Sequence, residues 1–331
     1  MKEQIDAVNR AFINCFTEKG YQRERSVDIS SEIDPSVTYI GSGISVLKPL
    51  LLNDQIHRTG NFIKQKAIRT QSLRNINKPE LITEYNSFFD ALCVLTRYEN
   101  LETLVRDSFS FFQDYLNVKP EDIMLRINSQ DKDLIEATKC LDPRVKIEFD
   151  TREEKYYKHK YGLDEQGIFG RNMNFAFFDK NKGEYLDVGN IIVLESAEKK
   201  YGAELALGVQ PAVMRMYGIP TSLEASYISD VVNLDSPEKF KYAECLEVVA
   251  NLTKERIMEK KTKKRFPIGM YRKYYKSLRE WMEKLGIGKA EVMQQMIDYT
   301  ALEYNPEFEY SRPAPAEQFL ERVSVGTERD D

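Results

Sequence analysis

Apolar and polar positions along this chain predict helices and strands in mixed order. Apolar residues with helical spacing predict helices over residues 3–19, 99–117 and 131–141. Short apolar runs bounded by glycine, proline or asparagine predict extended segments or strands. These are residues 37–40, 44–52, 67–70, 88–95, 123–128, 145–149, 175–178 and 185–195. A further segment, 203–217, reads as a strand or loop that continues into a helix.

The pattern changes after about Val232. Helical spacing then dominates, over residues 237–257, 270–285 and 289–304. From Pro306 the chain is rich in Pro, Glu and Arg, a composition typical of a mobile tail. We therefore expect a mixed sheet-and-helix domain over residues 1–232, a helical domain over 233–305 and a mobile tail over 306–331.

Composition narrows the function classes. The chain has 331 residues, of which 42% are hydrophobic and 31% charged, a balance that can bury a sizeable core. No apolar run approaches the roughly 18–20 residues that a membrane span needs. The first residues lead into an amphipathic helix and not into the apolar segment of a signal peptide. A cytoplasmic protein with no membrane partner is the expectation.

The reactive side chains are few. The four cysteines are far apart and none forms a C-x-x-C pair, so we expect neither a disulfide scaffold nor a zinc site. The two histidines, His57 and His159, are too few for a multi-histidine metal site. Any catalysis must therefore rest on Arg, Lys, Asp, Glu, Asn and backbone groups.

Charge is distributed unevenly. The net charge of −5 argues against a dedicated nucleic-acid binder, yet Lys254–Lys276 holds ten Lys and Arg against two Glu. In this run Tyr271, Tyr274 and Tyr275 lie among the Lys and Arg residues. Such a segment could bind the acceptor stem of a tRNA. The alternative is a solvated helix end with a turn at residues 267–269.

The first 70 residues contain a set of short motifs in a distinctive order. Phe16-Thr17-Glu18-Lys19-Gly20 is followed by Asp34-Pro35, then by residues 38–49, TYIGSGISVLKP, and finally by Gln65-Lys66-Ala67-Ile68-Arg69. In this order and spacing the motifs resemble the opening of the catalytic core of alanyl-tRNA synthetase, a class II aminoacyl-tRNA synthetase. The resemblance covers roughly residues 5–220. It implies an α+β fold, in which an antiparallel sheet flanked by helices is followed by a small helical domain.

Arg69 is the first catalytic candidate. A fixed guanidinium on a strand suits the negative charge that develops when pyrophosphate leaves ATP. The resemblance identifies Gln65–Arg69 and Ser87–Ala91 with the two strands of motif two, which binds ATP through residues such as Asp90. It implies that Arg69 holds the α-phosphate and that Phe88 or Phe89 stacks on adenine. Taken without the resemblance, Phe88 is core and Arg69 is one surface arginine among many.

The loop between those strands departs from the family. Its Arg-His-His before the second strand is Glu84-Tyr85-Asn86 here, and its glycine-rich start is lost. The contact with the γ-phosphate is therefore open, and Arg74 is the cation that could replace it.

A second segment resembles the amino-acid pocket of the family. There Asn190 matches an asparagine that contacts the amino acid, and Asp187 matches a glutamate and becomes a candidate for the substrate ammonium or for Mg²⁺. Gly189 replaces a tryptophan, which predicts a larger or reshaped pocket. The alternative is a half-buried strand with a polar turn residue.

The third motif is weaker. Arg215 stands where the family's motif-three arginine clamps the ATP γ-phosphate, but Met214 and Ala212 replace its glutamate and a glycine. Gly208 lies nearest the place of an aspartate that binds the substrate ammonium. The family's tryptophan and glutamate are also missing from residues 167–178. The amino-acid pocket is therefore rebuilt relative to the family.

The resemblance leaves three functions open. The first is activation of alanine or a related small amino acid with ATP and Mg²⁺, followed by transfer to tRNA. The second keeps activation but loads a small molecule, a carrier protein or an amine. The third is a non-catalytic synthetase-like binding protein. No editing or C-terminal domain is expected in this sequence, and a homodimer through motif one is a further expectation.

Overall fold

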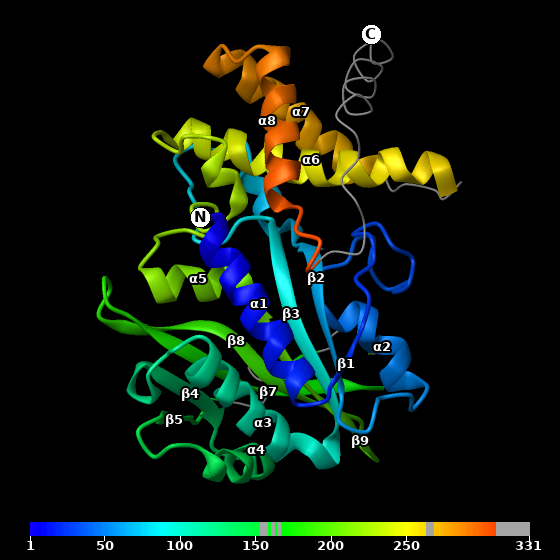
Figure 1. Cartoon of the computed structure of the whole chain (residues 1–331), viewed down its shortest axis with the longest axis vertical. Helices are drawn as coiled ribbons and strands as arrows, with labels where there is room; N and C mark the ends of the chain where they lie inside the picture. The colour runs from blue at the N-terminus through cyan, green and yellow to red at the C-terminus, as the bar shows by residue number, and fades with distance from the viewer. Residues whose placement is uncertain (153–157, 160–162, 164–166, 263–267, 309–331) are drawn as a thin grey trace.

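A computed structural model describes residues 1–152, 158–159, 163, 167–262 and 268–308. Within them, a large mixed sheet carries helices on both faces, and three further helices gather at one end of the molecule (Figure 1). The predicted fold class, an α+β sheet flanked by helices, is confirmed.

The sheet is mainly antiparallel and has the order β1-β2-β3-β9-β8-β7-β4-β5, with β6 paired to β7. Only the β1–β2 and β4–β5 pairs are parallel among these described strands. The strands are β1 (Gln22–Arg23), β2 (Asn61–Ile68), β3 (Phe88–Arg97), β4 (Ile123–Asn128), β5 (Lys146–Asp150), β6 (Lys158–His159), β7 (Phe169–Asp179), β8 (Glu184–Glu195) and β9 (Lys200–Gly208).

Two hydrophobic cores lie on the two faces of the sheet. On one face, α1 packs Phe12 against Phe62 of β2, with ring centroids 5.7 Å apart, and α5 and the C-terminal helices join the same core. On the other face, α2 packs Leu47 and Leu51 over Ile63 and Leu95. The helices are α1 (Lys2–Glu18), α2 (Ile44–Leu52), α3 (Leu101–Ser110), α4 (Lys132–Ala137), α5 (Val209–Tyr217), α6 (Pro237–Thr262), α7 (Ile268–Leu285) and α8 (Lys289–Glu303).

The extended conformation predicted for residues 37–40 and 44–52 is wrong. Residues 37–40 belong to no strand, and Ile44–Leu52 is the helix α2. A short, almost continuous apolar run does not distinguish a buried strand from a buried helix. Here the segment is helical because its apolar residues pack against the core on that face of the sheet. Gly43 begins it where a Cβ would lie 2.3 Å from the Cys93 sulfur.

The helix predicted over 99–117 is shorter than expected. It runs from Leu101 to Ser110 and continues as a π-helical turn, Phe111–Tyr115. The predicted tail lies outside the described residues from residue 309 onward. The division into domains at residues 232 and 305 stays a prediction.

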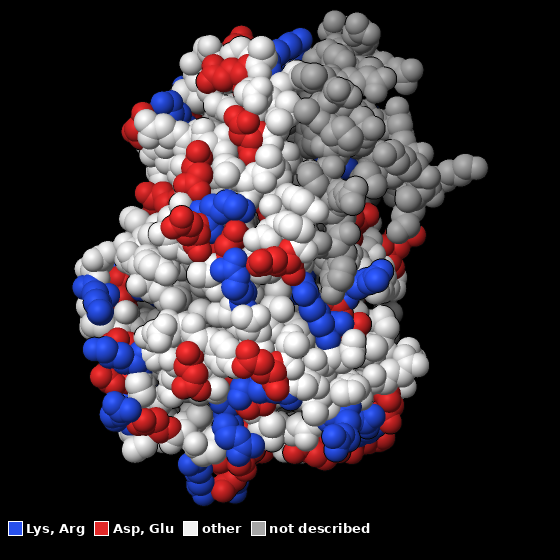
Figure 2. All heavy atoms as spheres, in the orientation of Figure 1, with Lys and Arg blue, Asp and Glu red and all other residues white. Residues whose placement is uncertain are grey.

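The surface is mixed in charge. On the face shown in Figure 2, basic and acidic side chains are interspersed over the sheet and its helices. None of the described helices is both long and apolar enough to cross a membrane.

Candidate active site

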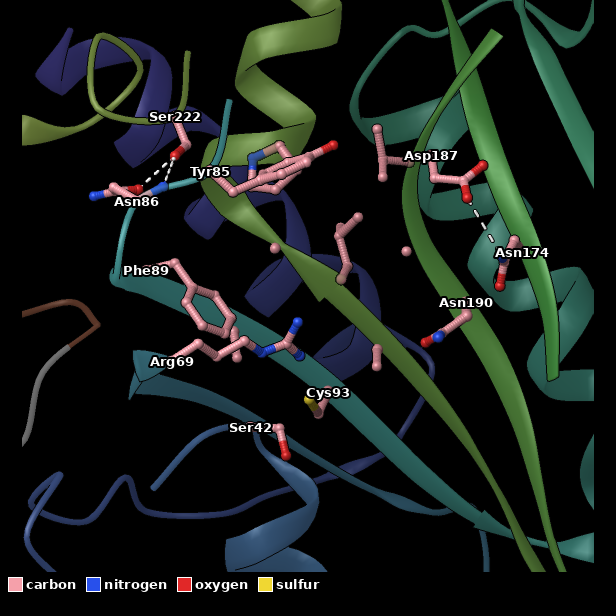
Figure 3. A pocket seen from close by; sticks show the side chains of 17 residues that line it. Ser42, Arg69, Tyr85, Asn86, Phe89, Cys93, Asn174, Asp187, Asn190 and Ser222 are labelled. Atoms are coloured by element: carbon pink, nitrogen blue, oxygen red, sulfur yellow. Dashed lines mark hydrogen bonds between the residues drawn. The ribbon is translucent and has the colours of Figure 1, made fainter. Parts of the chain in front are cut away.

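A cavity of about 280 Å³ opens on the face of the sheet that carries α2 (Figure 3). Strands β3, β9, β8 and β7 form its floor, and the loop before β3 forms part of its wall. Its polar and aromatic lining residues are Ser42, Arg69, Tyr85, Asn86, Phe89, Cys93, Asn174, Asp187, Asn190 and Ser222. Several segments that are distant in sequence thus meet here, as expected of a small-molecule site.

Arg69 and Phe89 form one end of the cavity. Arg69 directly follows β2, and its backbone N–H donates to the Ser87 carbonyl at 2.8 Å, which ties it to the start of β3. Its guanidinium lies over the Phe89 ring, 5.0 Å from the centroid, and its Nε donates to the Gly41 carbonyl at 3.4 Å. The pair presents a positive charge and an aromatic ring to the same space.

Phe88 and Asp90 do not face this cavity. Alternate residues of a strand point to opposite faces, so these two project away from Phe89. Phe88 is 1% exposed in the core beneath α1, and Asp90 is buried with the Lys64 ammonium 2.9 Å away. The Asp90 N–H also donates to Gln210 at 2.9 Å.

Arg74 lies apart from the cavity as well. It sits on the short 3₁₀ helix Thr70–Asn75, is exposed, and does not line the cavity.

Asn190 and Asp187 form the other end of the cavity. Asn190 faces Asn174 of β7 and Ala206 of β9 in the strand register. The Asp187 carboxylate accepts from Arg126 Nη1 at 2.5 Å and from the Asn174 amide at 3.2 Å. The side chain that could meet an ammonium group or a cation is therefore already ion-paired.

Arg215 is buried beside the cavity and does not line it. Its guanidinium lies 2.5 Å from Glu84, 3.3 Å from Asp179 and 3.2 Å from the Tyr85 hydroxyl. Burial alone would raise the pKa of Glu84, but hydrogen bonds from Arg215 and Lys182 hold that pKa below its usual value. Glu84 is thus a charged partner that keeps Arg215 in place.

Two glycines lie where the family resemblance places larger residues. A Cβ at Gly208 would lie 2.8 Å from the Pro211 ring, so a side chain there would clash. A Cβ at Gly189 would lie 2.4 Å from the Ala206 carbonyl oxygen and 2.8 Å from the Phe175 ring. Phe175 fills the space on that side of β8. Gly189 therefore does not enlarge the cavity in that direction, contrary to the expectation from the sequence.

Sequence reasoning missed Ser42, Cys93, Asn174 and Ser222. The sequence could have indicated Asn174 as a site residue, because it is a polar residue at an alternate position of a mostly apolar strand. No sequence pattern indicates Ser222, since its place at the cavity depends on its hydrogen bonds with Asn86. Burial raises the pKa of the Cys93 thiol well above its ordinary value, which makes the thiol a poor nucleophile.

The basic run Lys254–Lys276 lies partly outside the described residues. Of its tyrosines, Tyr274 is fully buried and donates to Ser87 at 2.5 Å, and Tyr271 is 8% exposed. These two rings are therefore core side chains and are not available to stack on bases.

Comparison with known proteins adds a sequence relationship. The alanine–tRNA ligase of Bacillus subtilis is 31% identical over 86 residues, which are 26% of this chain and 10% of the ligase. That of Latilactobacillus sakei is 21% identical over 262 residues, 70% of this chain and 29% of the ligase. The chain is similar in sequence to alanine–tRNA ligases. The similarity spans less than a third of these relatives, and no family model matches the chain.

Solved structures of aminoacyl-tRNA synthetases align with part of this chain. The pyrrolysyl-tRNA synthetase PylSc of Desulfitobacterium hafniense aligns at 8% identity and a TM-score of 0.41, over 66% of this chain and 70% of that one. The apo histidyl-tRNA synthetase of S. aureus aligns at 11% identity and a TM-score of 0.40, over 64% and 70%.

Proposed function

We propose that this chain activates an amino acid with ATP, forming an aminoacyl-adenylate and pyrophosphate, and transfers the acyl group to tRNA. The observation that carries the proposal is the Arg69–Phe89 pair at one end of the cavity, with Asn190 and Asp187 at the other. The sequence similarity to alanine–tRNA ligases supports the same chemistry. Alanine or a related small amino acid is the substrate that this similarity suggests.

The reaction requires little covalent chemistry from the protein itself. A carboxylate oxygen of the amino acid attacks the α-phosphorus of ATP, and the bond from that phosphorus to the bridging oxygen breaks as pyrophosphate leaves. Arg69 would hold the α-phosphate and stabilise its developing charge, while Phe89 would stack on adenine. Asn190 would orient the amino acid at the far end.

The chain fits a resident magnesium ion poorly. Among the described residues no group of three or more His, Cys, Asp or Glu side chains is arranged to hold a metal. Asp187 is the carboxylate that lines the cavity, and it is engaged by Arg126. Magnesium would therefore arrive with ATP as part of the substrate, and no step depends on a site in the protein.

Amino-acid-dependent exchange between pyrophosphate and ATP tests activation. We expect exchange with one amino acid in the wild type, and a loss of roughly 100- to 1,000-fold in Arg69→Ala, as for removal of one group that stabilises transition-state charge. Arg97→Ala is the matched control, because Arg97 is an arginine at the far end of β3 that pairs with Asp54. Background exchange with every amino acid would count against activation.

The acceptor needs a separate test. Retention of tRNA in a gel-shift assay that weakens steeply with salt would support transfer to tRNA. Indifference to tRNA in a protein that performs exchange would favour the second function, in which a small molecule, carrier protein or amine takes the acyl group.

A non-catalytic binding protein is the competing proposal, and the burial of Arg215 favours it. The Arg215 side chain is 1% exposed and held by Glu84 and Asp179, so it does not reach the cavity. Nucleotide binding without turnover, unchanged in Arg215→Ala, would support this proposal over activation.

A further inference from the structure

Glu244 of α6 is a buried carboxylate that meets both ends of the loop between β2 and β3. It is 3% exposed. Its Oε1 accepts from the Ser72 hydroxyl at 2.9 Å, from the Ser87 hydroxyl at 2.8 Å and from the Ser87 backbone N–H at 3.2 Å. Ser72 comes three residues after Arg69, and Ser87 comes two residues before Phe89. One oxygen atom of α6 therefore joins the two chain segments that carry the arginine and the phenylalanine of the cavity.

The contacts around Glu244 are themselves buried. Its other oxygen, Oε2, lies 3.8 Å from the ammonium of Lys241, one turn earlier on α6, whose side chain is 2% exposed. Ser87 is held from a second side, because the Tyr274 hydroxyl of α7 donates to the Ser87 hydroxyl oxygen at 2.5 Å. Hydrogen bonds to a carboxylate are strong where water is excluded. The cluster therefore fixes Ser87 firmly.

The place of Arg69 depends on Ser87. The Arg69 backbone N–H donates to the Ser87 carbonyl at 2.8 Å, so the residue that Glu244 holds is also the backbone partner of Arg69. The Arg69 side chain has weaker contacts, a 3.4 Å hydrogen bond to the Gly41 carbonyl and the face of the Phe89 ring. The position of the guanidinium is therefore set mainly by the backbone to which Glu244 is bonded.

The rest of the loop offers few other anchors. Of residues 70–87, only Ser72, Ile76 and Ser87 are buried, and the others are exposed or half-buried. All three buried residues contact the C-terminal helices, since the Ile76 carbonyl accepts from the Trp281 indole N–H at 3.1 Å. A catalytic group must be held to within about 0.5 Å of its working position. This loop thus depends on α6 and α7 for that precision.

We propose that Glu244 is a positioning residue for the activation step, which holds both ends of the loop so that Arg69 meets the α-phosphate of ATP. The inference rests on the proposed function, because that function gives Arg69 this contact. Glu244 does not line the cavity, so it acts only through the residues that it holds. The active site on the sheet then depends on a helix of the C-terminal region.

Two substitutions of Glu244 test the proposal by pyrophosphate exchange and by titration of a non-hydrolysable ATP analogue. Glu244→Met removes the accepting oxygen and is expected to lower exchange by about 10- to 100-fold, as for a misplacement of about 1 Å, and to weaken nucleotide binding. Glu244→Gln keeps an oxygen that can accept the same hydrogen bonds and is expected to retain most of both. Ser72→Ala/Ser87→Ala leaves Glu244 paired with Lys241 and repeats the test if Glu244→Met does not fold.

Glu255→Met is the matched control. Glu255 is another carboxylate of α6, and it accepts the backbone N–H groups of Ile29 and Ser30 and does not line the cavity. Its substitution also removes an acceptor from this helix, but one that does not hold the loop. This variant is expected to perform exchange and to bind nucleotide as the wild type does.

A double-mutant cycle separates positioning from general support of the fold. If Glu244 acts through Arg69, Glu244→Met should lower nucleotide affinity and exchange by less than about twofold once Arg69→Ala is present, because residues that act as a unit are not additive. A loss by the same factor with and without Arg69 would overturn the proposal, since it would mean that Glu244 only stabilises the fold.

The outcomes also distinguish this inference from the proposed function. Exchange that is equal in wild type and in folded Glu244→Met would overturn the role of Glu244 and leave activation standing. Nucleotide binding that depends non-additively on Glu244 and Arg69, in a protein without exchange, would refute activation and uphold the hold of Glu244 on Arg69.

Discussion

At the scale of single residues, two adjacent phenylalanines of β3 have different roles, because successive side chains of a strand point to opposite faces of the sheet. Phe89 lies beneath the Arg69 guanidinium in the cavity, whereas Phe88 lies in the core on the opposite face. From the sequence, either phenylalanine was a candidate for stacking on adenine. The sequence does not show which one stacks, because the face of a strand that meets a ligand depends on what covers the other face.

Substitution of each phenylalanine by alanine separates these tasks. Phe89→Ala is expected to weaken ATP binding by about 1–3 kcal/mol, the range for loss of a base–aromatic stack, with little change in stability. Phe88→Ala is expected to lower the free energy of unfolding by about 3–5 kcal/mol, because it leaves a cavity in the core. Nucleotide titration and urea unfolding measure the two effects. Equal nucleotide affinity in Phe89→Ala and wild type would contradict the proposed stacking.

Glu204, buried behind the cavity floor beside the Cys93 thiol, gives a second residue-scale prediction, on stability against pH. Its pKa is about 8 in the folded state against an ordinary value of 4.5, so the folded state holds the proton more tightly. This contribution to stability is complete below pH 4.5 and is lost as pH rises toward 8, by up to about 1.4 kcal/mol per pH unit. Glu204→Gln should remove that part of the decline. Urea unfolding of both proteins from pH 5 to pH 8 measures the difference, and parallel curves would contradict the raised pKa.

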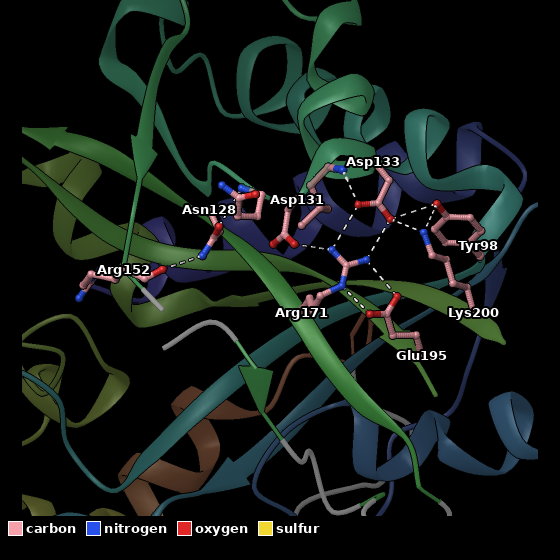
Figure 4. A network of polar contacts seen from close by, with 10 residues as sticks. Tyr98, Asn128, Asp131, Asp133, Arg152, Arg171, Glu195 and Lys200 are labelled. Atoms are coloured by element: carbon pink, nitrogen blue, oxygen red, sulfur yellow. Dashed lines mark hydrogen bonds and ion pairs between the residues drawn. The ribbon is translucent and has the colours of Figure 1, made fainter. Parts of the chain in front are cut away.

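At the scale of elements, a charged cluster joins β7, β8 and the start of α4 (Figure 4). The Arg171 guanidinium lies 2.7 Å from Asp131, 3.0 Å from Asp133 and 2.5 Å from Glu195. Burial opposes ionisation of Asp133, yet hydrogen bonds from Arg171 and Lys200 outweigh it and hold the pKa of Asp133 below its usual value. Arg171 is therefore the cation that all three carboxylates share, and Lys200 is a second cation, 2.6 Å from Asp133.

Loss of that arginine is expected to be severe. Arg171→Met leaves three carboxylates close together and poorly solvated, and should lower the free energy of unfolding by about 3–5 kcal/mol. Arg144→Met is the control, because Arg144 pairs with Asp142 on the exposed surface and should leave the unfolding midpoint unchanged. Denaturant unfolding monitored by circular dichroism measures both variants, and equal midpoints would show that the cluster does not hold these elements together.

At the scale of the whole molecule, the C-terminal helices share the core of the sheet. Tyr242, Tyr274 and Tyr299 belong to the same hydrophobic cluster as Phe12 and Phe88. The Trp281 indole N–H also donates to the Ile76 carbonyl at 3.1 Å, which joins α7 to the loop between β2 and β3. The two predicted domains are thus in extensive contact.

This shared core predicts one cooperative unfolding transition. The chain has one tryptophan, Trp281 on α7, so its fluorescence reports on α7 and on its contact with the loop between β2 and β3. Circular dichroism reports on the whole molecule. The two urea transitions are expected to coincide. A fluorescence transition at lower urea would mean that residues 233–305 unfold, or separate from the sheet, before the rest of the chain unfolds.

The sequence by itself determined the class of fold, the helix of residues 3–19, most strands of the sheet and the relationship to alanine–tRNA ligases. These follow from local periodicity and from short motifs, which depend on near neighbours in the chain. Tertiary structure decided that Ile44–Leu52 is a helix, that Phe89 and not Phe88 faces the cavity, and that Arg215 is held away from it. It also buried Glu204 behind the cavity floor, beside the Cys93 thiol. These features depend on which faces of the sheet are covered and which charges meet across it, and residues distant in sequence set both.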